Sequence, residues 1–338
     1  MRAFVITGPR SSAVVDVPPP VAAPGEVVVD VLRAGVCGTD VEFFTGEMAY
    51  LHTGDAAYPM RIGHEWCGVV ASVGAGVDPS WTGRRVTGDT MLGCSSCARC
   101  RSGRQHLCAS RYEIGIRGGW PGALASSLLV PARALVPLPS TVDDTVGALV
   151  EPGGNALRAF RATGVAAGER LLVVGPGAIG LLVALIARSS GVDVHLLGVT
   201  PASLSFARSL GFASVWTPSD LPASGFDGVV DASTGAEVPA LALSVVEPGR
   251  RVVYIGLSGE PSLVDSRELV FKDLTVTGIL SASGGLEGTV DLYAGGAVDP
   301  RPLVAATVGL DEVAAILAGL AGDRPAGQAP KIHVDPTR

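Results

Sequence analysis

Apolar and polar positions alternate in short runs through the first part of the chain. Runs of β-favouring residues are separated by segments that contain Gly and Pro, as at 27–32 (VVVDVL), 68–73 (GVVASV) and 125–130 (ASSLLV). Residues 43–62 and a cysteine-containing segment interrupt these runs as long excursions. Short apolar runs bounded by turn residues are typical of strands. The pattern therefore predicts a compact β-rich domain over residues 1–147.

From about residue 148 the pattern changes to strand-like apolar runs that alternate with helical stretches. The expected elements, strands and helices in turn, lie at 170–174, 178–190, 194–198, 201–210, 228–231, 238–246 and 251–255. This alternation predicts a second, doubly wound α/β domain at 148–283, with helices on both faces of a parallel sheet. Residues 284–338 are less regular. They predict a short helix at 310–320 and a strand at 331–334, which we expect to return to the first domain.

Composition and charge restrict the possible classes of function. The 338 residues suffice for two domains, and 47% hydrophobic against 17% charged residues argues for sizeable cores and against disorder. A formal net charge of −7 disfavours binding to nucleic acid or to anionic membranes. The first residues lack the features of a signal peptide. The longest apolar run, 171–187, is interrupted by glycines and is too short for a membrane span. We expect a cytoplasmic protein that acts on a small molecule.

Four of the six cysteines lie close together with the spacing C-x2-C-x2-C-x7-C. They are Cys94, Cys97, Cys100 and Cys108. Four thiolates can surround one tetrahedral ion, and such a closed shell is typical of structural zinc. Without a secretion signal, metal binding is favoured over disulfides. An iron–sulfur run would have a shorter last gap followed by Pro, and a nucleic-acid zinc ribbon would lie in a basic chain. The spacing predicts a structural zinc lobe at about 93–109.

A glycine-rich loop, G-P-G-A-I-G, follows the strand-like run at 170–174. The three motif glycines and the two residues that open the next helix are Gly175, Gly177, Ala178, Ile179 and Gly180. The first glycine permits a tight turn, the second lets the backbone approach a pyrophosphate, and the third lets the helix pack on the strand. The N–H groups of the helix N-terminus favour phosphates. Between a strand and a helix the motif predicts a dinucleotide site, with a plain glycine-rich turn as the alternative.

The residue that ends the next strand bears on the choice between NAD and NADP. An acid at this position holds the ribose hydroxyls of the adenosine, but this chain has Gly198 there. Without the acid, nothing repels the negative charge of a 2′-phosphate. No arginine follows at 199–203, although the hydroxyls of Thr200 and Ser203 could bind that phosphate. The sequence predicts NAD or NADP as cofactor and favours NADP.

A second set of metal-binding residue types is spread along the chain as Cys37, His64, Glu65 and Glu151. One Cys, one His and one or two carboxylates can make an open zinc site with room for water or substrate. Each residue also has a structural interpretation. Cys37 could be a small buried apolar residue, His64 a core histidine, and Glu151 an acid at a helix start. Distance along the sequence does not show convergence, so the residues alone leave both interpretations open.

Together these motifs resemble the zinc-dependent medium-chain dehydrogenase/reductase family, within the alcohol dehydrogenase superfamily. The matching segments are GVCGTD (35–40), GHE followed by GVV (63–70), the cysteine lobe, LVEP (149–152) and GPGAIG (175–180). The resemblance covers nearly the whole chain and is closest to the sorbitol, glucose and threonine dehydrogenase branch. It implies a GroES-like catalytic domain at 1–147 that residues 284–338 complete, a Rossmann NAD(P)-binding domain at 148–283, and a homodimer or homotetramer.

The resemblance also implies which residues bind the two zinc ions of each chain. Cys37 and His64 would be ligands of a catalytic zinc. Glu65 would lie beside this metal and exchange with water, and Glu151 would be the third protein ligand or hold the metal-bound water. The four lobe cysteines would bind the structural zinc.

Two further residues of the GVCGTD motif receive roles from the resemblance. Asp40 would hydrogen-bond the far nitrogen of His64 and so fix its tautomer. Thr39 would contact the substrate hydroxyl and pass its proton on. Many relatives have a histidine a few residues later to complete this proton relay. This chain has Val41 and Glu42 there, so Glu42 could substitute or the relay could be shorter.

The chemistry of zinc agrees with the implied activity. Zinc lowers the pKa of bound water to about 7 and would stabilise an alkoxide in the same way, while the nicotinamide accepts the hydride. We therefore expect an enzyme that oxidises a secondary alcohol, of polyol, sugar or cyclitol type, to a ketone. The alternatives are a zinc-free quinone or enone reductase and a non-catalytic nucleotide-binding relative. The presence of both Cys37 and His64 disfavours the two alternatives.

Overall fold

The computed structural model describes residues 1–320 and 329–338, which form two compact units. The first unit contains Met1–Glu151 and the described residues of the C-terminal segment at 304–320 and 331–338. The second unit contains Pro152–Leu303 and therefore extends past residue 283, where the sequence analysis placed a boundary.

A seven-stranded sheet forms the centre of the first unit. Its strand order is β16-β17-β3-β4-β5-β9, and β8 pairs with β3 outside this path. The strands are β3 (Glu26–Val36), β4 (Glu65–Val73), β5 (Arg85–Gly88), β8 (Ser127–Pro131), β9 (Leu135–Pro137), β16 (Val304–Val308) and β17 (Lys331–Val334). Two small sheets pair β1 (Arg2–Gly8) with β2 (Ser11–Asp16), and β6 (Met91–Leu92) with β7 (Tyr112–Glu113). The strands expected at 27–32, 68–73 and 125–130 correspond to β3, β4 and β8.

The helices of the first unit are short and lie in the connections between strands. They are α1 (Gly38–Thr45), α2 (Ala49–Thr53), α3 (Ala98–Arg101), α4 (Asp144–Ala148) and α11 (Val313–Leu320), with 3-10 turns at Pro79–Trp81, Gln105–Leu107, Ala132–Ala134 and Leu310–Glu312. α5 (Val150–Thr163) starts at the end of this unit. The core is one cluster in which Phe4, Ile62 and Trp66 are fully or almost fully buried.

The pairing of β3 with β4 positions the chemically interesting residues of the first unit. The two strands are antiparallel, and Gly35 near the end of β3 lies opposite Glu65 at the start of β4. Cys37 follows β3 directly, and His64 precedes β4 directly. Two segments that are far apart in sequence therefore meet at one end of the strand pair.

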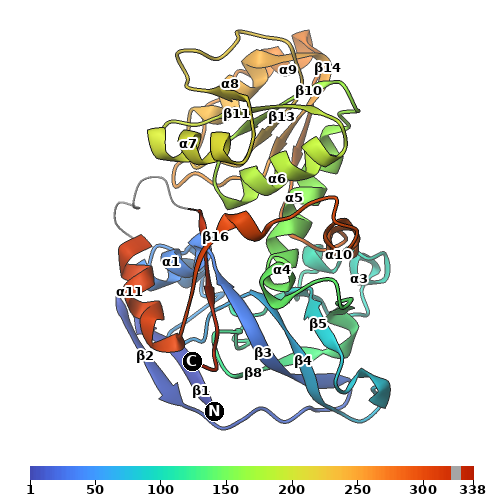
Figure 1. The fold of residues 1–338 in the computed structure, drawn as a ribbon, viewed down its shortest axis with the longest axis vertical. Coiled ribbons are helices and arrows are strands. Elements are labelled where there is room, and N and C mark those ends of the chain that lie inside the picture. The colour runs from blue at the N-terminus through green and yellow to red at the C-terminus, as the bar shows by residue number, and fades with distance from the viewer. Residues whose placement is uncertain (321–328) are drawn as a thin grey trace. The chain divides into compact units, whose positions relative to one another are not determined.

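The second unit contains a six-stranded parallel sheet, as the alternating pattern predicted. Its order is β12-β11-β10-β13-β14-β15. The strands are β10 (Arg170–Val174), β11 (Asp193–Leu197), β12 (Ser214–Trp216), β13 (Phe226–Asp231), β14 (Val246–Tyr254) and β15 (Thr275–Gly278). Figure 1 shows the central strands side by side, with α6 and α7 beside β10 to β12 and α8 beside β13 and β14. The strand order reverses between β10 and β13, the place where doubly wound sheets bind ligands.

The helices of the second unit connect these strands. They are α6 (Ala178–Ser189), α7 (Pro201–Ser209), α8 (Val238–Val245), α9 (Ser266–Phe271) and α10 (Leu286–Ala294), with a 3-10 turn at Arg301–Leu303. The expectation of irregular structure just after residue 283 was wrong for α10. Its buried residues Leu286, Val290 and Tyr293 follow a helical spacing that the neighbouring glycines obscured. No helix among the described residues is long and apolar enough to cross a membrane.

Candidate functional site

Three residues with metal-ligating side chains converge where β3 and β4 meet. One ligand atom from each of Cys37, His64 and Glu65 lies within 4.8 Å of the other two. His64 and Glu65 are buried, with exposed fractions of 5% and 1%, and Cys37 is half-buried. A thiol, an imidazole and a carboxylate form a donor set that suits zinc. If Cys37 were only a small packing residue, its sulfur would not be expected to lie beside the ligand atoms of His64 and Glu65.

Asp40 lies behind His64 on the first turn of α1. Its Oδ2 accepts a hydrogen bond of 2.8 Å from the backbone N–H of Cys37, and its Oδ1 lies 3.7 Å from Nδ1 of His64. The second distance is too long for a hydrogen bond, so the structure brings Asp40 and His64 together but does not show the hydrogen bond expected between them. Burial alone would lower the pKa of His64, whereas the charges of Asp40, Cys37 and Glu151 raise it well above its usual value. The surroundings of His64 thus favour a positive charge, as a cation site requires.

The carboxylate of Glu65 also forms a buried ion pair with Lys331 on β17. The side chains are 1% and 4% exposed, and Nζ of Lys331 donates to Oε1 of Glu65. Burial would raise the pKa of Glu65, but Lys331 and His64 hold it below its usual range. Gly35 makes room for this carboxylate, because a Cβ at Gly35 would lie 2.2 Å from Oε2 of Glu65.

Lys331 and Gly35 were not identified from the sequence. Lys331 lies more than 260 residues from Glu65 along the chain, and only the pairing of β17 with β3 brings the two together. The sole signal was a lysine within a short apolar strand near the C-terminus. Gly35 gave no signal beyond its place in the GVCGTD motif.

Glu151 and Thr39 lie near this cluster but are not part of it. Glu151 is 7% exposed in the first turn of α5, and its charge acts on both His64 and Lys331. It is not among the three residues whose ligand atoms lie within 4.8 Å. Thr39 lies in the first turn of α1, between Cys37 and Asp40.

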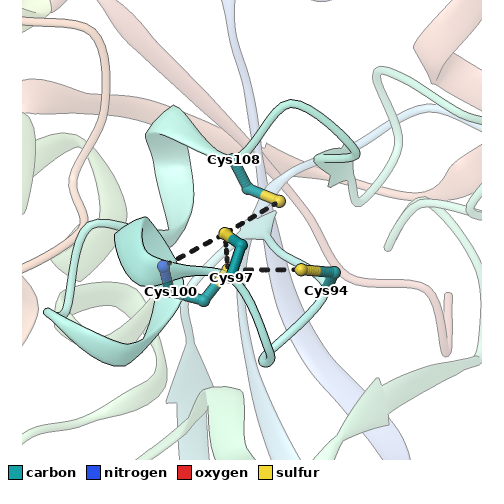
Figure 2. Close-up of side chains that lie close together, drawn as sticks. All are labelled: Cys94, Cys97, Cys100 and Cys108. Atoms are coloured by element: carbon teal, nitrogen blue, oxygen red, sulfur yellow. Dashed lines mark hydrogen bonds between the residues drawn. The ribbon is translucent and has the colours of Figure 1, made fainter.

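The four lobe cysteines converge as their spacing predicted. Figure 2 shows their side chains turned toward one another from one short segment that contains α3. The ligand atoms of Cys94, Cys97, Cys100 and Cys108 all lie within 4.8 Å of one another. The sulfur of Cys97 is 3.5 Å from that of Cys100 and 3.8 Å from that of Cys108. Four Zn–S bonds of about 2.3 Å would need sulfurs about 3.8 Å apart, so the geometry fits a tetrahedral ion.

Neighbouring groups favour the thiolate form of Cys94 and Cys97, whereas burial raises the pKa of Cys100 to about 11. The hydroxyl of Ser96 donates to the sulfur of Cys94 over 3.4 Å, and hydrogen bonds of this kind lower the pKa of Cys94 to about 5. The remaining cysteine, Cys67, has a different environment. It is fully buried, donates to the carbonyl of Asp144, and burial raises its pKa to about 12. Cys67 is therefore a packing residue.

The glycine loop of the second unit has the geometry expected of a dinucleotide site. Gly175 has a φ of 89°, in the left-handed region that permits its tight turn. A Cβ on Gly180 would lie 2.0 Å from the carbonyl oxygen of Gly175, so α6 can approach β10 only with glycine there. A Cβ on Gly177 would meet nothing within 4 Å, which leaves open space beside the backbone. Ala178 and Ile179 form the first turn of α6.

The segment after β11 contains hydroxyl groups and no charge. Gly198 follows the strand, and Thr200 caps the N-terminus of α7, where its Oγ1 accepts from the backbone N–H of Ser203 over 3.2 Å. The hydroxyls of Thr200 and Ser203 lie 2.7 Å apart. No acidic side chain stands at 198–203 to repel a phosphate.

Comparison with protein-family models assigns most of the chain. Residues 23–140 match the alcohol dehydrogenase GroES-like domain, and residues 178–294 match the zinc-binding dehydrogenase domain. The first match contains β3 to β9 of the first unit, and the second contains β11 to β15 of the second unit. The chain belongs to the zinc-dependent medium-chain dehydrogenase family.

Individual medium-chain dehydrogenases resemble the chain over most of its length. An L-threonine 3-dehydrogenase of Coxiella burnetii is 31% identical over 273 residues, 77% of this chain and 78% of the relative. A 2-dehydro-3-deoxy-L-galactonate 5-dehydrogenase of Pseudoalteromonas atlantica is 32% identical over 310 residues, 88% of this chain and 89% of the relative. The crystal structure of a putative zinc-binding dehydrogenase from Sinorhizobium meliloti, bound to NADP, superimposes with a TM-score of 0.89 at 28% identity and covers 99% of both chains.

Family membership and geometry together define the chemistry of this dehydrogenase. It is an alcohol-type oxidoreductase that uses zinc and NAD or NADP. Its fold is the GroES-like and Rossmann combination that the sequence predicted.

Proposed function

We propose that the protein interconverts a secondary alcohol, of polyol, sugar or cyclitol type, and the corresponding ketone with NAD or NADP. The observation that carries the proposal is the convergence of the ligand atoms of Cys37, His64 and Glu65 within 4.8 Å. A buried set of one thiol, one imidazole and carboxylate fits a catalytic zinc with an open position. A zinc-free reductase would need no such set.

Each residue of the set has a task in this proposal. Cys37 and His64 hold the metal, and Asp40 keeps the imidazole of His64 oriented from behind. Glu65 is held between the metal site and Lys331, so that it can exchange with water beside the metal. When bound, zinc supplies Lewis-acid chemistry that lowers the pKa of an alcohol oxygen.

Glu151 and Thr39 complete the proposed site. Glu151 is the third protein ligand or holds the water at the open position, which agrees with the effect of its charge on the pKa of His64. Thr39 contacts the substrate hydroxyl and relays its proton, accepting it while releasing its own hydroxyl proton to the next group. Glu42, three residues later on α1, is exposed and is a candidate for the next step of the proton's path, since partial desolvation and the nearby charge of Glu47 raise the pKa of its carboxyl group.

The cysteine lobe, the second unit and the assembly of the chain also have roles in this proposal. We propose that the four lobe cysteines bind a second, structural zinc. The first unit then corresponds to the catalytic domain, which the C-terminal segment completes, and the second unit to the cofactor domain. The glycine loop would hold the pyrophosphate, and Thr200 and Ser203 favour NADP through their hydroxyls. A cytoplasmic location and a homodimer or homotetramer complete the proposal.

The names of the relatives support the proposed substrate class. The two curated relatives described above are a threonine 3-dehydrogenase and a dehydrogenase of the 5-position of a sugar acid. Both names denote oxidation of a secondary hydroxyl that has polar neighbours. The pocket that selects among such substrates is built by loops, which differ most between relatives.

A substrate panel tests this proposal directly. Polyols, sugars, cyclitols and simple alcohols would each be assayed with NAD and with NADP by following nicotinamide reduction. We expect turnover with a polyhydroxylated secondary alcohol. Activity only with enones or quinones, or no activity with any alcohol, would contradict the proposal.

Metal analysis of a ligand variant separates catalysis from folding. Wild-type protein should contain two zinc ions per chain, and Cys37→Ser should retain one, keep its melting temperature within a few degrees and lose turnover by at least about 100-fold. Zinc found only in the lobe of the wild-type protein would refute the catalytic-zinc assignment.

A further inference from the structure

Three residues on neighbouring strands of the first unit lie in one row across its sheet. His333 on β17 is directly opposite Gly35 on β3, and Gly35 is directly opposite Glu65 on β4. Residues directly opposite each other in antiparallel strands present their side chains on the same face of the sheet. Because Gly35 has no side chain, the side chains of His333 and Glu65 border the same space from its two sides. Oε2 of Glu65 lies in that space, 2.2 Å from the place of a Cβ on Gly35.

His333 is a fully buried polar side chain whose ring nitrogens are not hydrogen-bonded. Its exposed fraction is 0%, and among the described residues neither nitrogen has a hydrogen-bond partner. Oε2 of Glu65 and Nε of Arg33 are likewise buried and without a partner there. Buried polar groups in proteins are almost always hydrogen-bonded, because an unpaired one loses its hydration without compensation. An apolar side chain would fill the place of the imidazole without this cost, so the ring indicates a polar task for His333.

The charged groups around His333 leave Glu65 as the acceptor that its ring can serve. Burial lowers the pKa of His333 to about 4, so the imidazole is neutral at ordinary pH and has one N–H donor and one acceptor nitrogen. The charged groups that act on the ring are Glu65, Lys331, Arg33 and Asp143. Of the two carboxylates, Asp143 already caps the N-terminus of α4. Glu65 has Lys331 on Oε1 only, so its Oε2 is the acceptor that remains.

We propose that His333 is a positioning residue for the catalytic-zinc site, whose ring N–H binds Oε2 of Glu65, directly or through one bound water, and holds the carboxylate against Lys331. The inference rests on the proposed function, in which Glu65 exchanges with water beside the metal. A buried water typically makes about three hydrogen bonds to polar groups that have no other partner. Glu65, His333 and Arg33 each supply such an atom.

This contact determines how readily Glu65 becomes a metal ligand. With Lys331 on one oxygen and His333 on the other, the carboxylate loses a hydrogen bond when it turns toward Cys37 and His64. A group shifts an equilibrium between two positions only by interacting differently with them, and the bond to His333 exists in one position alone. Removal of the ring N–H should therefore make Glu65 a more permanent ligand and leave less room at the metal for water or substrate.

Cobalt spectroscopy of the full-length protein tests this proposal. Co²⁺ would replace zinc at the catalytic site, where its visible absorption reports the number and kind of its ligands. In His333→Leu we expect the cobalt bands to weaken and shift as a carboxylate oxygen joins the ligands, while zinc affinity does not fall. His333→Gln retains a donor and should keep the wild-type spectrum. Ile332→Val is the matched control on the same strand and should also keep it, because Ile332 alternates to the other face and packs against the apolar core.

A double variant shows whether the effect passes through Glu65. Glu65→Gln has no ligating carboxylate, so the addition of His333→Leu should not change its cobalt spectrum further. The proposal would be overturned by an unchanged spectrum of His333→Leu, or by a shift that persists in the Glu65→Gln background. It would also be overturned if His333→Leu weakened zinc binding by about 10- to 100-fold, since the ring would then only support the ligands.

Failure of this inference differs from failure of the proposed function. A wild-type protein that binds no metal at Cys37 and His64 overturns both. A wild-type protein that binds the metal and oxidises an alcohol, with an unchanged cobalt spectrum in His333→Leu, overturns the inference alone. If His333→Leu fails to fold, nuclear magnetic resonance of ¹⁵N-labelled histidines decides. The ring N–H of His333, assigned with His333→Gln, should shift in Glu65→Gln, and an unchanged resonance would contradict the contact.

Discussion

Lys331 shows how one residue can control a site to which it supplies no ligand. Its side chain and that of Glu65 are both almost fully buried, so each charge depends mainly on the other for compensation, and His64 contributes less to that of Glu65. Removal of one member of such a pair costs about 3–5 kcal/mol, because the remaining charge stays buried and unpaired. Lys331→Met should therefore lower the free energy of unfolding by about this amount, as measured by urea denaturation.

Two comparisons identify the source of that loss. In Lys331→Met combined with Glu65→Gln, stability should partly return, since no charge is left unpaired. Arg2 forms an exposed ion pair with Asp311, so Arg2→Met should change stability little.

The pKa of Glu65 lies below its usual value in the folded protein. The contribution of the pair is therefore present above the usual carboxyl pKa and is lost as the pH falls through the folded value. A Lys331→Met variant as stable as the wild type would contradict this account.

At the level of elements, substitutions in the strand–loop–helix unit around Gly177 can distinguish an effect on cofactor binding from an effect on folding. Gly177 has open space where a Cβ would point, and its φ of −87° is accessible to alanine. Gly177→Ala should leave the melting temperature unchanged but weaken binding of NADH or NADPH at least about tenfold, or about 1.4 kcal/mol. The added methyl group would occupy the space that a pyrophosphate needs. Fluorescence titration of the reduced cofactor measures this effect.

Gly180→Ala is the matched contrast within the same loop. Its Cβ would lie 2.0 Å from a backbone oxygen, which can yield only if α6 moves. Overpacking of this kind costs roughly 1–3 kcal/mol, so Gly180→Ala should lower the melting temperature as well as affinity. Unchanged cofactor binding by Gly177→Ala would contradict the assignment of the pyrophosphate site to this loop.

The cysteine lobe is a second element whose stability depends on a ligand. It contains only short helices and the two-residue strands at its borders, so little apolar burial holds it together. Structural zinc in small peptides supplies an apparent 10–16 kcal/mol of binding free energy. Cys97→Ser should therefore lose one zinc per chain and lower thermal stability, measured by metal analysis and calorimetry. Cys67→Ala should keep both ions. Equal zinc content and melting in Cys97→Ser would refute a structural zinc in the lobe.

At the level of the whole molecule, the sequence predicted most of what depends on local pattern. The alternation after residue 148 identified the parallel sheet, and the cysteine spacing identified the lobe, because neighbours in sequence determine both. The convergence of Cys37 with His64 could not be derived in this way. It depends on the register of β3 against β4, which the residues alone do not reveal.

The features that the sequence did not reveal share a physical cause. Lys331 reaches Glu65 only because the chain returns to its first sheet at the very end. The space that Gly35 leaves for Glu65 depends on the same sheet. These contacts depend on strand pairing between segments far apart in sequence, and residue type alone does not predict such pairing.

This connectivity makes a prediction about fragments. Residues 152–303 form one continuous segment that contains the complete six-stranded sheet of the second unit, so this segment should fold alone and bind NADH or NADPH. Residues 1–149 alone lack β16 and β17, which leaves one side of β3 partly unpaired and Glu65 buried without Lys331. This fragment should unfold non-cooperatively, as followed by circular dichroism. Joined to residues 304–338 by a glycine–serine linker, it should regain a cooperative transition and bind the structural zinc. Cooperative folding of residues 1–149 alone would show that the C-terminal strands are dispensable for the first unit.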